Sequence, residues 1–197
     1  MMKLIELTVT SMRAAGQDPS VCDERRFRQA LSRFPTGVIV ATAWDETGNR
    51  DLGMTMSSFS PVSLEPPLVL FSVDRRALSL EAWRRVPGYA VNVLSEHQHA
   101  LSERFSRPRA DKWLGVEFQR GRHGAALLSG AVAHFECTPH SQCEAGDHIT
   151  FFGLVTQFAI GTGAPLVFHE SAYAAIARGA SLHSEYQPGR WPLPIHY

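Results

Sequence analysis

The stretch from Leu52 to Ser72, LGMTMSSFSPVSLEPPLVLFS, decides the fold of this chain. Its pattern predicts a strand, a turn rich in hydroxyl side chains, and a second strand that begins with the apolar run 68–71. Proline cannot donate to a β-ladder, so Pro66 and Pro67 are expected before the second strand and not in its middle. Hydroxyls and backbone N–H groups in such a turn can hold a flat polar ligand, although solvated serines are the simpler interpretation.

The rest of the chain is predicted to consist mainly of strands. Apolar runs predict strands over 37–44, 89–94, 131–137, 149–160 and 166–169. Residues 107–124 and 138–146 are expected to form loops. No strand–helix alternation recurs, so the expected fold is mainly β, an antiparallel barrel with helical caps.

The predicted helices are few and short. Asp23 is expected to cap a helix that ends at Pro35, with Phe27, Ala30, Leu31 and Phe34 on one face. Asp74 is expected to cap a helix over 77–85, and Ser95 with Gln98 forms a capping box for a helix that ends near Phe105. A last helix is predicted over 171–178.

Length and charge favour one globular domain. The 197 residues carry 19 basic and 19 acidic side chains, so no electrostatic argument favours nucleic acid or an anionic membrane as a partner. Three cysteines without a CxxC pair indicate free thiols in a reducing compartment. The short apolar start is not expected to be a secretory signal, and the chain is predicted to be cytoplasmic. Residues 1–22 are expected to form an N-terminal extension, 23–178 the single domain and 179–197 a C-terminal tail.

A second motif, Gly146-Asp147-His148, lies far along the chain, with Gly153 after four intervening residues. The glycine-rich nucleotide motifs GxGxxG and GxxxxGK[ST] are absent, so a nucleotide would bind by another design. Five segments in order, over roughly residues 25–178, resemble the flavin reductase family, the reductase components of two-component flavin monooxygenases. These segments are Thr36–Val38, Thr55–Phe59 with Val62–Leu68, Val91–Leu94, Gly146–His148 with Gly153, and Leu166–His169. The chain departs from the family pattern at Pro61 and Phe168.

The resemblance implies an FMN-binding split β-barrel with antiparallel, Greek-key-like strands. It also implies an NAD(P)H:flavin oxidoreductase that transfers a hydride from NADH or NADPH to FMN or FAD. The implied partners are a second copy of the chain, with the site at the homodimer interface, and a separate monooxygenase that receives reduced flavin by diffusion. Two alternatives stay open: a flavin-binding carrier or sensor without turnover, and a pyridoxamine-phosphate-oxidase-like enzyme.

The residues of a flavin site are implied partly by chemistry and partly by the resemblance. Hydroxyls and backbone N–H groups beside an apolar wall suit the flavin ring, and cationic side chains suit a phosphate. The predicted cofactor-binding residues are Thr36, Gly37, Thr55, Met56, Ser57, Ser58, Phe59, Ser72, Val73, Arg75, Arg76, Ser79, Phe105, Gly146 and Asp147. Simpler interpretations stay open for several of them: a solvated arginine pair, a helix-to-strand turn at Thr36, and a core aromatic at Phe105.

His148 is the predicted catalytic residue. The resemblance places this histidine near the flavin and the nicotinamide, where an imidazole can donate a hydrogen bond and can change charge near neutral pH. Hydride transfer depends on stacking and distance more than on an acid or a base, so no general base is assigned. The neighbouring Asp147 has a simpler role as a cap of its own loop.

A zinc site is a rival interpretation of the same region. His134, Cys137, His140 and Cys143 recur at every third residue, and His148 follows. Alternate residues of a strand share a face and every-third residues do not, and zinc knuckles pair their ligands more closely. No metal site is therefore predicted.

Overall fold

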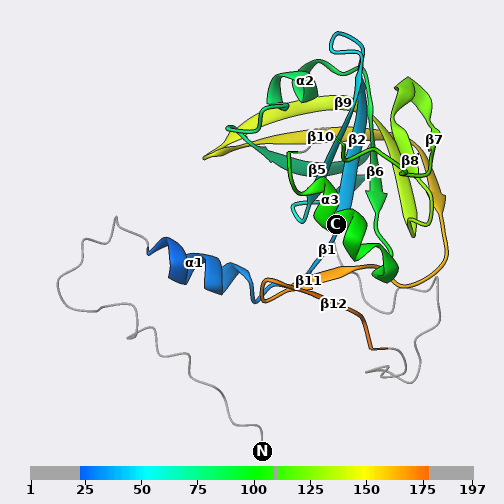
Figure 1. Ribbon diagram of the computed structural model, residues 1–197. Helices are drawn as coiled ribbons and strands as arrows, with labels where there is room; N and C mark the ends of the chain where they lie inside the picture. The colour runs from blue at the N-terminus through cyan, green and yellow to red at the C-terminus, as the bar shows by residue number, and fades with distance from the viewer. Residues whose placement is uncertain (1–22, 109–110, 178–197) are drawn as a thin grey trace, which may run out of the picture.

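The computed structural model describes residues 23–108 and 111–177 (Figure 1). Within them, a seven-stranded antiparallel sheet has the strand order β3-β2-β6-β9-β10-β5-β4. Its strands are β2 (Ile39–Asp45), β3 (Arg50–Met56), β4 (Ser60–Leu64), β5 (Pro67–Asp74), β6 (Tyr89–Val93), β9 (Ala133–Ala145) and β10 (His148–Ile160). The predicted mainly β, antiparallel class is confirmed.

The connection between β3 and β4 closes this sheet into a barrel. These two strands lie at opposite ends of the strand order, yet only residues 57–59 separate them in the chain. So short a link requires the sheet to curl until its two edges approach each other. Ser58 holds the link in place, because its Oγ accepts from the Ser72 N–H at 2.9 Å and donates to the Ser72 carbonyl at 3.3 Å.

Aromatic side chains fill the barrel interior. The Phe71 ring stacks on Phe151 with 5.4 Å between ring centroids and meets Tyr89 edge-to-face at 5.0 Å. Trp83 of α2 (Leu80–Arg85) meets Phe71 edge-to-face at 5.8 Å and is buried, so this short helix covers the core. Gly153 allows β10 to pack closely against Tyr89, because a Cβ at this position would lie 2.5 Å from the Tyr89 hydroxyl.

A second apolar cluster packs between the barrel wall and α3 (His99–Phe105). The capping box predicted at Ser95 and Gln98 is present at η2 (Glu96–Gln98), which leads into α3. Two small sheets complete the structure: β1 (Thr36–Gly37) with β11 (Val167–His169) and β12 (Ala172–Ala174), and β7 (Phe118–Arg120) with β8 (Ala126–Leu128). A 3-10 turn, η3 (Arg122–Gly124), joins β7 to β8.

Helix α1 (Glu24–Leu31) projects away from the barrel and contributes no buried residue (Figure 1). The predicted cap is present, since Asp23 Oδ1 accepts from the backbone N–H groups of Arg25 at 3.0 Å and Arg26 at 3.3 Å. The predicted apolar face points to solvent: the exposed fractions are 53% for Phe27, 56% for Leu31 and 73% for Phe34.

Several predicted elements were wrong. Residues 138–145 are part of β9 and not a loop, because hydrogen bonds to β10 extend the strand although its side chains are mostly exposed. Residues 172–174 form β12 and not a helix, since pairing with β11 overrides the helical propensity of an alanine-rich run. The loop expected over 107–124 contains β7. Asp74 does not cap α2, since its Oδ1 accepts from the Arg76 N–H at 2.7 Å.

The predicted extension over 1–22 and the tail over 179–197 lie outside the described residues. Among the helices of the described part, none is long and apolar enough to cross a membrane.

Candidate functional site

A groove of about 760 Å³ lies along β3. It is lined by residues 50–55 of β3, by 76–79 between β5 and α2, by 105–108 at the end of α3, and by 112–113. β3 is the terminal strand of the seven-stranded sheet, so one edge of this strand has no neighbouring strand within that sheet. The groove therefore runs beside a free strand edge.

Side chains from the groove wall mark which backbone groups face outward. Lys112 Nζ donates to the Gly53 carbonyl at 2.8 Å, and Trp113 Nε1 donates to the Asp51 carbonyl at 3.2 Å. In an antiparallel strand the N–H and C=O of one residue point to the same side, and successive residues alternate. The N–H groups of Gly53 and Thr55 consequently point away from β2, toward the open edge.

Gly53 allows an aromatic wall to pack close to this edge. A Cβ on Gly53 would lie 2.5 Å from Phe105 Cε1 and 2.8 Å from Trp113 Cζ2, closer than atoms can pack. Phe105 and Trp113 meet edge-to-face with 4.8 Å between ring centroids. Lys112 Nζ lies 5.9 Å from the Phe105 ring centroid, and burial, followed by the charge of Arg50, lowers the Lys112 pKa.

Arg76 contributes a cation elsewhere along the groove. Its Nη2 donates to Asp74 Oδ2 at 2.8 Å and its Nε donates to Asp74 Oδ1 at 3.1 Å. These hydrogen bonds hold the Asp74 pKa well below its usual range. The Arg76 side chain remains largely exposed, so a ligand phosphate can reach it.

The Gly146-Asp147-His148 turn contacts the residues around Arg76, although about seventy positions separate the two segments in the chain. The Arg75 N–H donates to the Asp147 carbonyl at 2.9 Å, and His148 lies opposite Asp74 in the β10–β5 register. Gly146 has a left-handed φ of +61°, which favours glycine. The predicted catalytic turn and the predicted phosphate-binding arginines are therefore neighbours.

His148 is oriented by a carboxylate of its own turn. Its Nδ1 lies 2.7 Å from Asp147 Oδ1, and this hydrogen bond, together with the charge of His148, lowers the Asp147 pKa. The imidazole is 41% exposed. Its other ring nitrogen is thus free to meet a ligand from solvent.

The structure brings some predicted site residues together and separates others. Thr55, Arg76, Ser79 and Phe105 line the groove. Ser57 and Ser58 lie in the link after β3, and Ser58 bonds Ser72. The side chains of Met56 and Val73 are buried in the core, so only their backbones could contact a ligand, and Phe59 stacks on Phe135. Thr36 and Gly37 pair with β11 and do not line the groove.

Most other residues that line the groove were not predicted to bind a ligand, among them Arg50, Gly53, Arg107, Lys112 and Trp113. Trp113 was predicted only as a packing anchor. Arg50 and Lys112 are isolated charges in polar segments, and no local pattern distinguishes them from solvated surface residues. Only the packing of residues 112–113 onto β3 brings them to one wall.

The rival zinc ligands do not converge. His134 Nδ1 lies 2.9 Å from Asn92 Oδ1, Cys137 is buried, and Cys143 is exposed. Across residues 23–108 and 111–177, no group of three or more His, Cys, Asp or Glu side chains could hold a metal ion.

Comparison with known proteins identifies the family. The model of the flavin reductase like domain matches residues 31–177, and the chain belongs to this family. The chain is 42% identical over 159 residues to the actinorhodin polyketide dimerase of Streptomyces coelicolor, with 80% of this chain and 89% of that protein covered. It is 37% identical over 155 residues to HsaB of Rhodococcus jostii, the reductase subunit of a flavin-dependent monooxygenase, with 78% of each chain covered.

A solved structure agrees with this assignment. The NADH:FAD oxidoreductase SgcE6 of Streptomyces globisporus, determined with NAD and FAD fragments, superimposes with a TM-score of 0.77 at 34% identity. The alignment covers 85% of this chain and all of that one. The family and the enzyme class predicted from the motifs, a flavin reductase that uses a flavin and a nicotinamide nucleotide, are confirmed.

Proposed function

We propose that this chain reduces FMN or FAD with NADH or NADPH and binds the flavin in the groove along β3. The observation that carries the assignment is the free edge of β3, which combines outward backbone donors at Gly53 and Thr55 with an apolar wall and the exposed Arg76. Backbone donors suit the polar edge of a flavin ring, and a cation suits its phosphate.

The residues of the groove have distinct roles in this proposal. The β3 edge orients the ring, Phe105 excludes water from one side of the groove, and Arg76 with Ser79 holds the phosphate. A bound flavin supplies the acceptor atom for the hydride of the nicotinamide ring. His148 orients the nicotinamide by a hydrogen bond, while Asp147 fixes the imidazole through Nδ1. The site residues carry out binding and alignment, and no side chain is required as a general base.

We propose two partners for this chain. HsaB is named as the reductase subunit of a flavin-dependent monooxygenase, which supports a separate oxygenase as the acceptor of reduced flavin. The exposed apolar face of α1 supports a homodimer, because no described residue of the chain covers Phe27, Leu31 and Phe34.

Steady-state oxidation of NADH and of NADPH tests the proposal. Purified protein is assayed with added FMN, FAD, riboflavin or no flavin, and the expected result is turnover that depends on flavin. Turnover without added flavin would indicate a bound prosthetic group. Flavin binding without oxidation of either nicotinamide would overturn the reductase assignment in favour of a carrier or sensor.

A further inference from the structure

One cation lies at the open edge of β3, where the polar edge of the flavin ring is proposed to bind. Lys112 Nζ donates to the Gly53 carbonyl at 2.8 Å and lies 5.9 Å from the centroid of the Phe105 ring. The outward N–H of Gly53 belongs to the same edge, because both backbone groups of a residue in an antiparallel strand point to one side. A ligand that accepts from this N–H therefore comes close to the ammonium group of Lys112.

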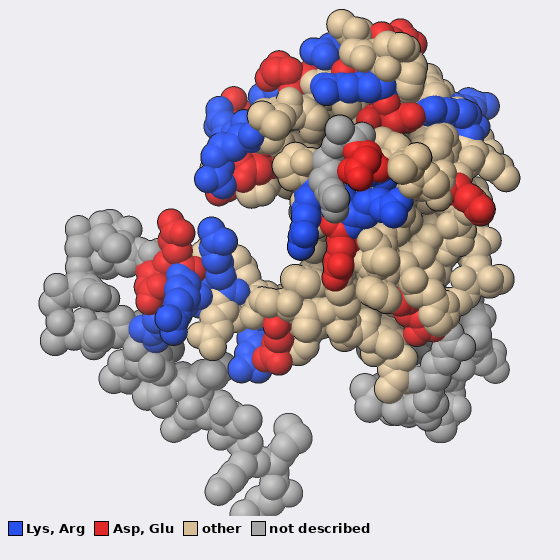
Figure 2. Space-filling view, viewed as in Figure 1, with Lys and Arg blue, Asp and Glu red and all other residues tan. Residues whose placement is uncertain are grey.

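The other cations of the groove are already paired with carboxylates or are exposed. Figure 2 shows blue and red side chains interspersed over one face of the molecule, whereas the groove is lined by four cations and one carboxylate. Arg50 and Arg76 each bond a carboxylate, and Arg107 is exposed. Lys112 is half-buried, and within the described part of the chain its ammonium group bonds a neutral carbonyl. Its charge is thus the one most available to a ligand at the β3 edge.

The surroundings of Lys112 oppose its charge. Burial, followed by the charge of Arg50, lowers the pKa of Lys112. One of the three donors of the ammonium group serves the Gly53 carbonyl, and the other two can serve another acceptor. An anion at this edge would offset the unfavourable charge, and partial burial would make the attraction stronger than on an open surface.

Hydride transfer turns the flavin ring from a neutral group into an anion. The C4–H bond of the nicotinamide breaks and an N5–H bond forms on the flavin, and the hydride carries both electrons with it. NADH becomes NAD⁺, and the flavin ring gains one negative charge. A cation beside the ring therefore interacts more strongly with the product than with the oxidised flavin. Resting on the function proposed above, we propose that Lys112 lies beside the flavin ring and stabilises reduced flavin relative to oxidised flavin.

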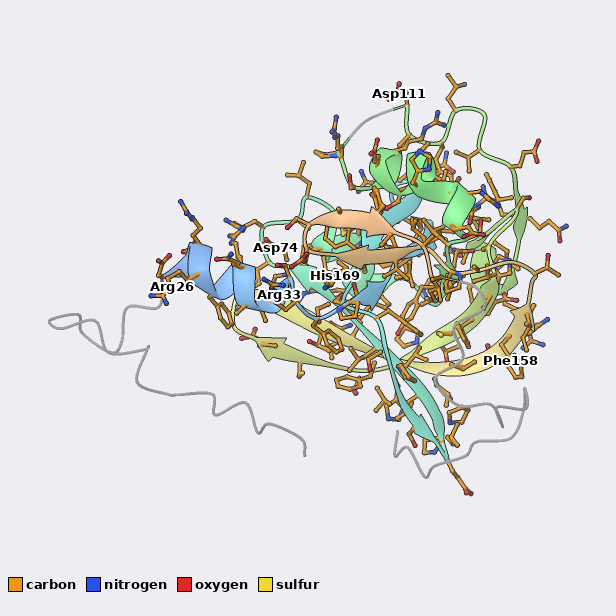
Figure 3. All side chains as sticks on the ribbon, turned by 90° about the horizontal axis from the view of Figure 1, so that it is seen from below. Arg26, Arg33, Asp74, Asp111, Phe158 and His169 are labelled. Atoms are coloured by element: carbon orange, nitrogen blue, oxygen red, sulfur yellow. The ribbon has the colours of Figure 1, made fainter. Side chains whose placement is uncertain are left out.

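Arg76 does not fit this role, because it lies at another part of the groove. In Figure 3, Asp74, the partner of Arg76, lies well apart from Asp111, the residue before Lys112. Arg76 is proposed to hold the phosphate, whose charge is the same in both redox states of the flavin. Discrimination between the two redox states consequently falls to Lys112.

Riboflavin tests the inference, because it has the flavin ring without a phosphate. The dissociation constants of oxidised and of anaerobically reduced riboflavin are measured without nicotinamide, by quenching of tryptophan fluorescence, since Trp113 lines the groove. We expect reduced riboflavin to bind about tenfold more tightly than oxidised riboflavin, the effect of a partly screened charge pair. By thermodynamic linkage this factor raises the two-electron reduction potential of the bound flavin by about 30 mV, which an anaerobic titration against an indicator dye measures independently.

Three variants separate the effect of the charge from structural damage. Lys112→Met removes the charge and keeps a long flexible side chain, so the preference for reduced riboflavin should fall below about twofold. Lys112→Arg keeps the charge and should retain most of the preference. Arg84→Gln removes an exposed cation of α2 that does not line the groove, and it should leave the preference unchanged.

Four results would overturn the inference while leaving flavin reduction intact. Equal affinity of the unaltered protein for the two redox states would exclude the effect. Equal weakening of both states in Lys112→Met would leave Lys112 only a structural contact of the groove wall. Loss of the preference in Arg84→Gln would assign it to the net charge of the protein, and a preference seen with FMN but not with riboflavin would assign it to the phosphate. Failure to bind any flavin would overturn both this inference and the proposed function.

Discussion

At the scale of single residues, His148 combines one fixed contact with one open position. Asp147 holds Nδ1 at 2.7 Å, while the ring is partly exposed beside the arginine turn. Asp74 lies opposite His148 in the neighbouring strand and bonds Arg76, which lines the groove. The histidine is therefore linked by contacts to the groove without lining it, an arrangement that suits a role in nicotinamide binding more than in flavin binding.

Replacement of His148 by alanine should impair the use of nicotinamide and spare flavin binding. We expect kcat/KM for NADH to fall about tenfold, the effect of one lost hydrogen bond in a binding site, and the flavin dissociation constant to change less than about twofold. His140→Ala, an exposed histidine on β9, is the matched control. Unchanged kcat/KM for NADH in His148→Ala would rule out this role.

Cys137 shows how burial sets the chemistry of a single side chain. Burial raises the pKa of this thiol to about 12, and the charge of Glu136 acts in the same direction. A group whose pKa is raised by folding stabilises the protein below its unfolded pKa of 9.0, and this contribution is lost as the pH rises toward about 12.

The free energy of unfolding of Cys137→Ala should therefore fall less at alkaline pH than that of the unaltered protein. At about pH 10.5 the unaltered protein should have lost roughly 2 kcal/mol of its free energy of unfolding through ionisation of the Cys137 thiol. Denaturant unfolding at pH 7 and at alkaline pH measures the difference. Cys143→Ala, at an exposed cysteine of the same strand, is the control and should keep the full pH dependence.

At the scale of elements, β3 owes its role to its position at the end of the sheet. A central strand would use its outward N–H and C=O groups for a neighbouring strand, whereas β3 offers them to Lys112, Trp113 and the groove. Gly53 is the residue of this strand that allows the wall to approach. The site consequently depends on an edge that is covered by side chains and a short helix instead of another strand.

Gly53→Ala should therefore destabilise the protein and narrow the groove. Because the added methyl group overlaps Phe105 and Trp113, we expect a loss of about 1–3 kcal/mol in the free energy of unfolding. Flavin affinity should fall as well. Gly37→Ala has open space around the new Cβ and should change stability by less than about 0.5 kcal/mol. Equal stability of the two variants would contradict this account of the groove wall.

At the scale of the whole molecule, α1 is a helix with an apolar face that the described part of the chain leaves exposed. It is attached to the barrel through the ion pair of Arg33 with Glu170 and through the Glu170 N–H, which donates to the Ser32 carbonyl at 2.9 Å. Its apolar residues face away from these contacts into solvent. A second copy of the chain would bury them, consistent with the proposed homodimer.

Phe27→Glu should shift the protein from dimer to monomer. Placing a charge in an apolar interface costs several kcal/mol, so dissociation should be evident at micromolar concentration. Light scattering coupled to size exclusion reports the mass. Gln29→Glu adds the same charge on the opposite face of α1 and should remain dimeric. A monomeric unaltered protein would contradict the proposed dimer.

The sequence was most informative where one local interaction decides the structure. Asp23 and the Ser95/Gln98 pair were assigned correctly as caps because their partners lie within three residues. The mainly β class followed from the apolar runs of successive segments and from the lack of a recurring strand–helix alternation. Local patterns misassigned residues 138–145 and 172–174, because these segments carry no apolar strand pattern of their own and become strands by pairing with β10 and β11.

The ordered motifs of the sequence were enough to identify the family and to name Thr55, Arg76, Ser79 and Phe105 as site residues. Only the tertiary structure showed that these four share a groove, and that Arg50 and Lys112 line it too. The physical reason is that the free edge of β3 depends on the strand order of the assembled sheet, in which β3 is the terminal strand. Arg50 and Lys112 line the same groove because segments about sixty residues apart in the chain pack together. No local sequence pattern encodes that packing.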